Sequence, residues 1–321
     1  MKNKGGMDSL GNRMKSYEIS YSRKLVNRMF TIIRMDGAAF HTYCKGLIKP
    51  FDKGLVDDMI STTKFLCENV QGCKLGYVQS DEISLILTDF DNITTQPWFG
   101  NELQKMCSTS ASLVTSKFNQ LRLKRHLENN LHPLNDILKI KQANFDSRVY
   151  QLPNFIEVSN YLKWRSQDAI RNSISACAQS LYSHKELHLK GGEAKQELIF
   201  QKGGKLINNL VNCGYIPVVN ILNPFAEFKK KDNFNWNDVP PHLKRGTTIS
   251  KQLIKKYYSN EVYEKDKRPE NIKLNDGWNV EMPTPGEFDY FKMVDEWTAY
   301  PADYSSAFEL LIPILKPNLV G

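Results

Sequence analysis

The chain has 321 residues, of which 41% are hydrophobic and 24% charged, a balance typical of soluble globular proteins that excludes disordered chains and small disulfide- or metal-stabilised scaffolds. The formal net charge is +8, but residues 260–321 contain 12 acidic and 6 basic residues, which leaves 37 basic and 23 acidic residues before them. A basic region of this size favours an anionic partner such as nucleic acid, although it also fits a solvated surface.

The first part of the chain combines a polar tail with a strand and a helix. Residues 1–16 are polar and contain glycines, which predicts a frayed tail. The apolar run 29–35 ends at Asp36-Gly37 and predicts a buried strand closed by a turn. Apolar residues three to four positions apart, or at multiples of this spacing, then predict an amphipathic helix over residues 53–70.

A β-hairpin and two long helices are predicted next. Apolar stretches on both sides of the polar residues 79–82 predict a hairpin over residues 75–87. A helical stripe of apolar residues covers 100–125, and a strand-like stretch surrounds residues 148–150. The second long helix is predicted over 164–187, because a glycine pair follows it.

The last third of the chain is less regular. Residues 197–201 and 246–250 predict short strands. The proline- and asparagine-rich stretch 220–241 predicts a loop or insertion. From residue 260 the chain is acidic and dotted with proline, and we expect an appended segment that packs on the main body. Alternating strands and helices indicate an α/β or α+β fold.

Membrane and disulfide-bonded classes are disfavoured. No stretch approaches the roughly 18 uninterrupted apolar residues that a membrane span needs, and no apolar signal core follows the N-terminus. We therefore expect no membrane partner and a cytoplasmic location. The six cysteines form no C-x-x-C pair, which predicts reduced core thiols rather than a zinc cluster.

Two carboxylates stand where strands end. Asp36 closes the first predicted strand, and Asp81 lies at the hairpin tip. If the hairpin pairs beside that strand, the two side chains meet at one end of the sheet. Phosphoryl transfer by two metal ions needs such oxygen ligands, as in polymerase palms and nucleotidyl cyclases. Plain turns have the same residue types, so spacing alone leaves both interpretations open.

Several basic and polar residues near these carboxylates are candidates for phosphate contacts. His41, Lys49 and Asp52 lie between the first strand and the first helix, while Lys105 and Lys195 come later in the chain. Cationic side chains form strong hydrogen bonds with phosphate. Each of them, taken alone, also fits an ordinary surface position.

Together these motifs resemble those of the tRNA-histidine guanylyltransferase family. The motif RMDGAAFH at 34–41, Lys49-Pro50, and GYVQSDE at 76–82 follow one another in the order and spacing of that family. The similarity covers about residues 17–250 and continues through motifs at 145–149, 164–165, 195–200 and 244–247.

The resemblance implies a palm-like antiparallel sheet flanked by helices, with an appended C-terminal segment. It divides the chain into a flexible tail at 1–16, a palm-like catalytic region at 17–135, a continuation with an RNA- or nucleotide-binding helix at 136–259, and the acidic segment 260–321. Members of the family add nucleotides to the 5′ end of RNA in the 3′-to-5′ direction and are commonly tetrameric. The implied partners are tRNA, ATP and GTP or other NTPs.

The resemblance also implies roles for individual residues. Two Mg²⁺ ions are held by Asp36, Asp81 and the Gly37 carbonyl, and Lys49 is implied as a catalytic residue. The positions implied to contact the nucleotide or its triphosphate are His41, Asp52, Ser80, Lys105, Asn172 and Lys195, with Arg34 and Glu82 in addition.

One segment departs from the enzymes dedicated to tRNA-histidine. They carry His-Ile-Asn-Asn where this chain has Ile170-Arg171-Asn172-Ser173. This form is similar to that of the guanylyltransferase-like branch, whose members repair truncated tRNA 5′ ends with a template. We therefore expect a template-dependent 3′-to-5′ nucleotidyltransferase that first activates the RNA 5′ phosphate with ATP or GTP. The alternative is 5′ guanosine addition to tRNA-histidine; a nucleotidyl cyclase or a non-catalytic RNA-binding protein is less favoured.

Candidate RNA contacts lie in the second half of the chain. His184 and His188 are four residues apart and can share a helix face, but a third zinc ligand is missing. Contact with RNA or nucleotide is favoured over zinc, and a solvated helix end fits about as well. The further RNA-binding candidates are Arg171, Lys244 and Arg245.

Overall fold

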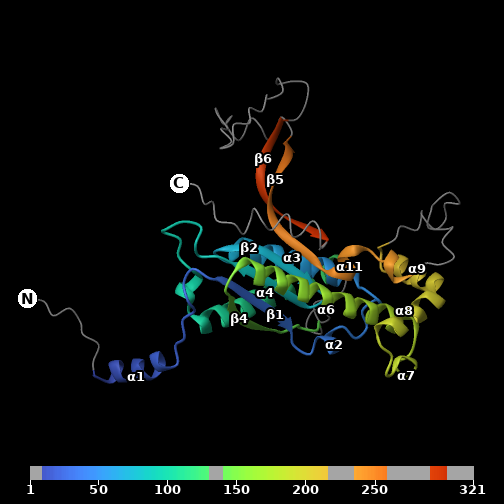
Figure 1. The fold of residues 1–321 in the computed structure, drawn as a ribbon, viewed down its shortest axis with the longest axis horizontal. Coiled ribbons are helices and arrows are strands. Elements are labelled where there is room, and N and C mark those ends of the chain that lie inside the picture. The colour runs from blue at the N-terminus through green and yellow to red at the C-terminus, as the bar shows by residue number, and fades with distance from the viewer. Residues whose placement is uncertain (1–8, 130–139, 216–234, 259–289, 302–321) are drawn as a thin grey trace, which may run out of the picture. The chain divides into compact units, whose positions relative to one another are not determined.

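The computed structural model describes residues 9–129, 140–215, 235–258 and 290–301 (Figure 1). The chain divides into two units by its internal contacts. The larger unit runs to Ile249 and resumes at Ala299, and the smaller unit is Ser250–Thr298. All site residues predicted from the sequence lie in the larger unit.

Four antiparallel strands form the sheet around which the larger unit is built. They are β1 (Phe30–Gly37), β2 (Cys73–Gln79), β3 (Glu82–Leu87) and β4 (Phe145–Leu152), in the order β4-β1-β3-β2. Strand β5 (Thr247–Tyr258) begins beside β2, and β6 (Tyr290–Pro301) follows β5 in the strand order. The predicted hairpin and its pairing beside the first strand are confirmed, as is the α+β fold class.

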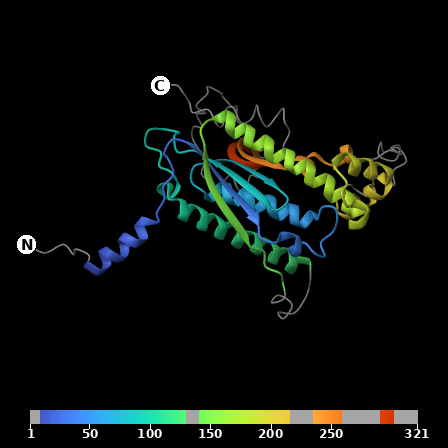
Figure 2. The same cartoon turned by 60° about the horizontal axis from the view of Figure 1, so that its bottom comes forward.

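Helices cover both faces of this sheet (Figure 2). On one face lie α3 (Lys53–Asn69) and α4 (Leu103–Asn129). A Cβ atom on Gly76 of β2 would lie 2.6 Å from Cys67 of α3, so glycine permits this close approach. On the other face lies α6 (Phe155–Leu181), whose Tyr161 hydroxyl is 2.6 Å from the Ser84 hydroxyl of β3.

The core lies between these layers. All six residues of β3 are buried, because the strand has β1 and β2 as neighbours and helices on both faces. One apolar cluster joins the sheet to α6; it consists of Phe30, Ile32, Leu75, Tyr77, Ile86, Val158 and Tyr161. Burial on both faces explains why β1 and β3 are near-continuous apolar runs rather than alternating patterns.

The predicted helices are confirmed, with shifted boundaries. The Asp52 carboxylate caps the first turn of α3 by accepting the Leu55 N–H at 2.8 Å. Helix α6 begins at Phe155, earlier than the sequence pattern predicts, because the Asn154 side chain caps it by accepting the Glu157 N–H. It ends at Leu181, and the four-residue helix α7 (His184–Leu187) follows.

One predicted strand is wrong. Residues 197–201 belong to the helix α8 (Gly192–Gln201), which is followed by α9 (Gly203–Asn212). The buried residue Ile199 of α8 contributes to an apolar cluster that includes residues of α6 and α9. A short apolar run fits a strand and a buried helix turn equally well, so tertiary packing decides. The strand predicted over 246–250 is confirmed as the start of β5.

The remaining elements are short or exposed. They are α1 (Ser9–Ser20), α2 (Phe40–Tyr43), α11 (Pro241–Arg245) and the 3-10 helices η1 (Trp98–Asn101) and η3 (Trp236–Asp238). Helix α1 has no buried residue and includes part of the predicted tail. Most of the predicted loop 220–241 and of the acidic segment lies outside the described residues, and the domain boundaries stay predictions.

Two expectations about composition can be compared with the structure. All six cysteines are free, and three of them, Cys67, Cys177 and Cys213, are buried, so the predicted core position is confirmed for these three. Among the helices that the structure describes, none is long and apolar enough to cross a lipid bilayer.

Candidate functional site

The two carboxylates predicted from the sequence lie at the same end of the sheet. Asp36 is near the end of β1, where it pairs in register with Glu82 of β3, and Asp81 is in the turn between β2 and β3. A Cβ atom on Gly37 would lie 3.0 Å from Oδ2 of Asp81. The Asp81 carboxylate therefore approaches the main chain of β1 closely, at a glycine where the Phe40 ring, nearer still to the same Cβ position, leaves even less room for a side chain.

The electrostatics of the pair match this geometry. Burial raises the pKa of Asp81, and the neighbouring Asp36 carboxylate raises it further against the hydrogen bonds that lower it. Two carboxylates that repel each other beside a main-chain segment are a donor set suited to a hard divalent cation. Among the described residues, no group of three or more His, Cys, Asp or Glu side chains could hold a metal, so the remaining ligands would be main-chain, water or phosphate oxygens.

Behind the carboxylates, Glu82 is part of a charged network with α6. Its two oxygens accept hydrogen bonds from Nε and Nη2 of Arg165 at 2.6 and 2.7 Å, and both side chains are buried. Arg165 also donates to Asp168 at 2.9 Å, and the exposed Arg171 donates to Asp168 at 2.9 Å. Glu82 therefore anchors the hairpin to α6 rather than facing the cavity described next.

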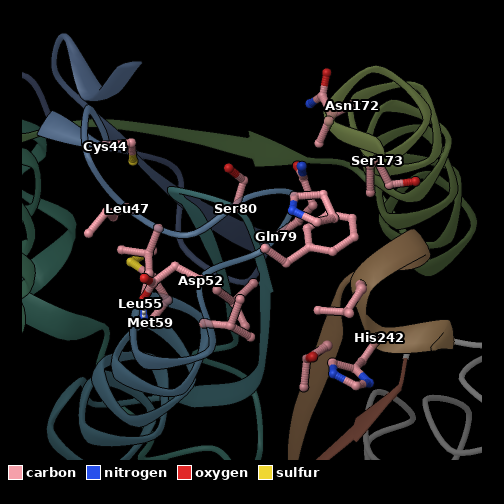
Figure 3. A pocket seen from close by; sticks show the side chains of 18 of the residues that line it. Cys44, Leu47, Asp52, Leu55, Met59, Gln79, Ser80, Asn172, Ser173 and His242 are labelled. Atoms are coloured by element: carbon pink, nitrogen blue, oxygen red, sulfur yellow. Dashed lines mark hydrogen bonds between the residues drawn. The ribbon is translucent and has the colours of Figure 1, made fainter. Parts of the chain in front are cut away.

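A cavity of about 230 Å³ lies beside the hairpin tip (Figure 3). Its walls come from the segment 44–60, the tip residues 78–80, α6, and the segment 242–247. Four predicted site residues line it, namely Lys49, Asp52, Ser80 and Asn172. Ser80 lines the cavity and directly precedes Asp81, so the carboxylate pair lies next to the cavity, although neither Asp36 nor Asp81 lines it.

Sequence reasoning missed several residues of this cavity. Ser173 of α6 and His242 of α11 also line it, across the view from Asp52 in Figure 3. Ser173 accepts a hydrogen bond from Trp236 Nε1 at 2.8 Å. Burial lowers the pKa of His242. The only feature of the sequence that could have indicated His242 as a site residue is its position just before the Lys-Arg-Gly-Thr motif.

Three predicted phosphate-binding residues lie elsewhere. His41 is exposed on α2, with Nε2 3.2 Å from the Thr42 hydroxyl. Lys195 on α8 donates from Nζ to the Ser175 hydroxyl of α6 at 3.1 Å and does not line the cavity. Lys105 is exposed near the start of α4.

The position of Lys105 follows from its neighbours. Cys107, on the same helix, interacts with the main chain of Val149, whose partner in β1 is Ile33. Thr115, further along α4, accepts the N–H of Phe145, which pairs with Gly37. The start of α4 therefore lies away from the carboxylate end of β1, and the described residues do not bring Lys105 to the cavity.

Arg34 lies on β1, in register with Ser84 on one side and Arg148 on the other. Its Nε atom is buried and has no hydrogen-bond partner among the described residues. The positive charge of Arg34 lowers the pKa of Glu82, against the larger effect of burial, which raises it.

The candidate RNA contacts differ in accessibility. Arg171, His184 and His188 are exposed, and the two imidazole rings are 6.3 Å apart between centroids. Lys244 is buried, and its Nζ donates to the Asn237 carbonyl at 2.6 Å, so the ammonium group points into the protein rather than toward a phosphate. Arg245 is half-buried, and its carbonyl accepts the Tyr77 hydroxyl at 2.7 Å.

Comparisons with known proteins agree with this geometry. Residues 11–153 match the model of the tRNAHis guanylyltransferase family. A bacterial tRNA(His) guanylyltransferase-like protein, solved in complex with ATP, is 40% identical with a TM-score of 0.61, over 75% of this chain and 88% of that chain. One solved in complex with GTP is 33% identical with a TM-score of 0.60, over 96% of this chain and 99% of that chain. A probable tRNA(His) guanylyltransferase of Dictyostelium discoideum is 26% identical over 239 residues, which are 72% of this chain and 78% of that protein.

Proposed function

Because the chain belongs to the tRNAHis guanylyltransferase family of nucleotidyltransferases, we propose that it adds nucleotides to the 5′ end of truncated tRNA in the 3′-to-5′ direction with a template. The observation that carries this proposal is the register of β1, β2 and β3. It places Asp36 and Asp81 at one end of the sheet, next to a cavity that the hairpin tip also lines.

The proposed reaction has two steps. A 5′-monophosphorylated RNA first attacks the α-phosphate of ATP or GTP, which releases pyrophosphate and leaves a nucleotidylated 5′ end. The 3′-hydroxyl of an incoming NTP then attacks the RNA 5′ phosphate, and the nucleoside monophosphate leaves. An RNA that starts with a 5′-triphosphate bypasses the first step, because pyrophosphate is then the leaving group.

The residues of the carboxylate pair fit Mg²⁺. Asp36 and Asp81 would hold the ions with the Gly37 carbonyl, and the oxygen-only donor set matches the preference of this cation. When bound, Mg²⁺ supplies neutralisation of the phosphate charge and orientation of the attacking oxygen. Burial raises the pKa of Asp81, and the neighbouring Asp36 carboxylate adds to this; a cation bound at the pair would relieve the repulsion of the two carboxylates.

The protein's own side chains bind and orient the nucleotide. Lys49 lines the cavity and supplies a positive charge for the phosphates. Asp52 and Ser80 line the same cavity and contribute a carboxylate and a hydroxyl group to it. The solved relatives in complex with ATP and with GTP support nucleotide binding by this chain. On family grounds we also propose a homotetramer.

The template-dependent branch is favoured by the segment Ile170–Ser173. Ser173, which stands where the dedicated enzymes have their second asparagine, lines the cavity beside the shared Asn172, so one residue that distinguishes this chain lies in the proposed nucleotide site. The Ser173 hydroxyl is already engaged by Trp236 and by the Ile170 carbonyl. Selection of the nucleotide therefore falls to a template base. Guanosine addition to tRNA-histidine is the second candidate function, because it is the activity after which the matching family is named.

The proposal is tested by incubating the protein with Mg²⁺, labelled NTPs and a tRNA that lacks its first nucleotide. We expect label at the RNA 5′ end, and none when EDTA removes the metal. A parallel reaction without RNA separates a nucleotidyl cyclase, which would release a cyclic nucleotide. Label that enters no RNA while a cyclic product accumulates would replace this proposal with the cyclase.

A further inference from the structure

We propose that Arg122 of α4 is a positioning residue for the nucleotide, which fixes the Asp52 carboxylate and the loop before α3 as one wall of the cavity. This inference rests on the proposed function, because it assigns a purpose to the wall that faces the nucleotide. It concerns a residue that lies outside the cavity lining and outside the motifs at 34–41, 49–50 and 76–82.

The starting point is a buried carboxylate on α3. Asp58 is 3% exposed, and two arginines of α4 hold it. Arg125 donates from Nε and Nη2 at distances down to 2.8 Å, and Arg122 donates from Nη1 at 3.1 Å. The two arginines are alike in this respect, since each secures α3 against α4 through the same carboxylate.

Arg122 extends beyond this ion pair to direct polar contacts with the cavity wall, whereas Arg125 packs against Gly54 and attracts Asp52 only at longer range. The Nε of Arg122 donates to the Tyr43 hydroxyl at 3.2 Å, and its Nη1 is 4.0 Å from Oδ1 of Asp52. Within the part of the chain that the structure describes, Arg125 makes no hydrogen bond or ion pair with either group. Arg122 is 15% exposed and Asp52 is 14% exposed at the side chain, so the attraction between them is poorly screened by water.

Asp52 passes this constraint to the cavity. Its Oδ1 accepts the Leu55 N–H at 2.8 Å and its Oδ2 accepts the Ile48 N–H at 3.3 Å. The carboxylate thus ties the loop 48–52 to the first turn of α3, and both parts line the cavity. A shift of Asp52 would move the loop with it, Lys49 included.

The guanidinium group is suited to this role and an ammonium group is not. Arginine presents five N–H donors in one rigid plane, so one side chain can serve Asp58, Tyr43 and Asp52 at once. Lysine keeps the charge but concentrates it at one point. In a lysine variant the Asp52 and Asp58 carboxylates would compete for one cation, and the wall would lose its fixed geometry.

Arg122→Lys and Arg125→Lys are therefore a matched pair of variants. Both keep the charge and both weaken the contact with Asp58, but only the first alters the hydrogen bond to Tyr43 and the ion pair with Asp52; the longer-range attraction of Arg125 to Asp52 is kept by the lysine charge. The dissociation constant of ATP is measured by equilibrium dialysis on the full chain without RNA, and the KM and kcat for NTP on a 5′-triphosphorylated RNA. We expect Arg122→Lys to raise both the dissociation constant and KM by about tenfold or more, since small misplacements are costly, and Arg125→Lys to change them less than twofold.

An equal effect of the two variants, or no effect of Arg122→Lys, would overturn the inference and leave both arginines with a structural role only. If Arg122→Lys does not fold, Tyr43→Phe decides, because it removes one hydrogen bond of Arg122 and little volume. We expect that variant to weaken ATP binding, and an unchanged dissociation constant would overturn the inference. If the wild-type protein binds ATP but extends no RNA, the proposed function is contradicted, while the effect of the variants on the dissociation constant of ATP still tests the role of Arg122.

Discussion

The ion pair between Glu82 and Arg165 should contribute strongly to the stability of the hairpin on α6. Both carboxylate oxygens are held, at 2.6 and 2.7 Å, and the side chains are 9% and 7% exposed. Replacement of Arg165 by methionine would leave a buried carboxylate without its main partner. Breaking such a pair from one side costs about 3–5 kcal/mol of the free energy of unfolding.

The matched control is Arg171→Met on the same helix. Arg171 is 64% exposed at the side chain and bonds Asp168 at 2.9 Å, and exposed pairs contribute about 0–1 kcal/mol. The assay is urea unfolding of both variants and of the double variant Glu82→Gln/Arg165→Met. The double variant should be more stable than Arg165→Met alone, because no unpaired charge remains in the core.

The pH dependence gives a second readout of the same pair. Burial raises the pKa of Glu82 above its ordinary value, and Arg165 lowers it in part, so the pKa should rise further in Arg165→Met. A carboxyl group with a raised pKa in the folded state stabilises the fold below its unfolded pKa, and this contribution is lost as the pH rises through the folded pKa. The destabilisation by Arg165→Met should therefore be largest near pH 7 and shrink as the pH falls toward about 4.3. Equal losses in Arg165→Met and Arg171→Met, or a loss that grows on acidification, would refute the reasoning.

Two further predictions concern the reaction and the RNA. Asp36→Ala or Asp81→Ala should abolish nucleotide addition in Mg²⁺, because a methyl group cannot replace a carboxylate ligand. The circular dichroism spectrum should stay unchanged, and wild-type turnover in either variant would contradict the metal assignment. The dissociation constant for tRNA should rise steeply between low and physiological salt, because RNA binding to a basic region releases counterions. The region before residue 260 has 37 basic and 23 acidic residues in a chain of net charge +8. A dissociation constant that does not change with salt would contradict a role of this charge in RNA binding.

Local sequence patterns are sufficient to predict the strands that hold the carboxylates. The run 29–35 is apolar because β1 is covered on both faces, and the polar tip 79–82 interrupts two apolar stretches that pair as β2 and β3. The register then follows from the hairpin itself, because its turn is short. The amino-acid sequence alone does not determine that the hairpin pairs beside β1; the structure supplies that pairing, which brings Asp36 and Asp81 to one end of the sheet.

Contacts between distant segments cannot be predicted in this way. Arg165 follows Glu82 by 83 positions, and Arg122 follows Asp58 by 64, so no periodicity links them. The same limit explains the wrong strand at 197–201, which packing against α6 turns into a helix. It also explains Lys244, whose basic motif suggested a surface residue although Trp236 and Asn237 enclose its ammonium group.

The proposed roles of individual site residues stay predictions, but the structure separates the residues that line the cavity from those that do not. Lys49, Asp52, Ser80 and Asn172 share one cavity, so their substitutions should affect nucleotide binding together. Lys105 lies away from that cavity in the described residues, and its proposed contact with a nucleotide therefore requires another arrangement, such as a second copy of the chain in the proposed tetramer.

The most direct test of the central claim varies the template base. A set of four tRNAs lacks the first nucleotide and differs only in the base that opposes the gap in the acceptor stem. The protein is incubated with each tRNA, Mg²⁺ and all four NTPs, and the added nucleotide is identified by sequencing. The account predicts that each tRNA receives the nucleotide complementary to its opposing base and that addition stops once the stem is complete. Guanosine added to all four tRNAs, whatever the opposing base, would contradict template dependence and establish the tRNA-histidine activity instead.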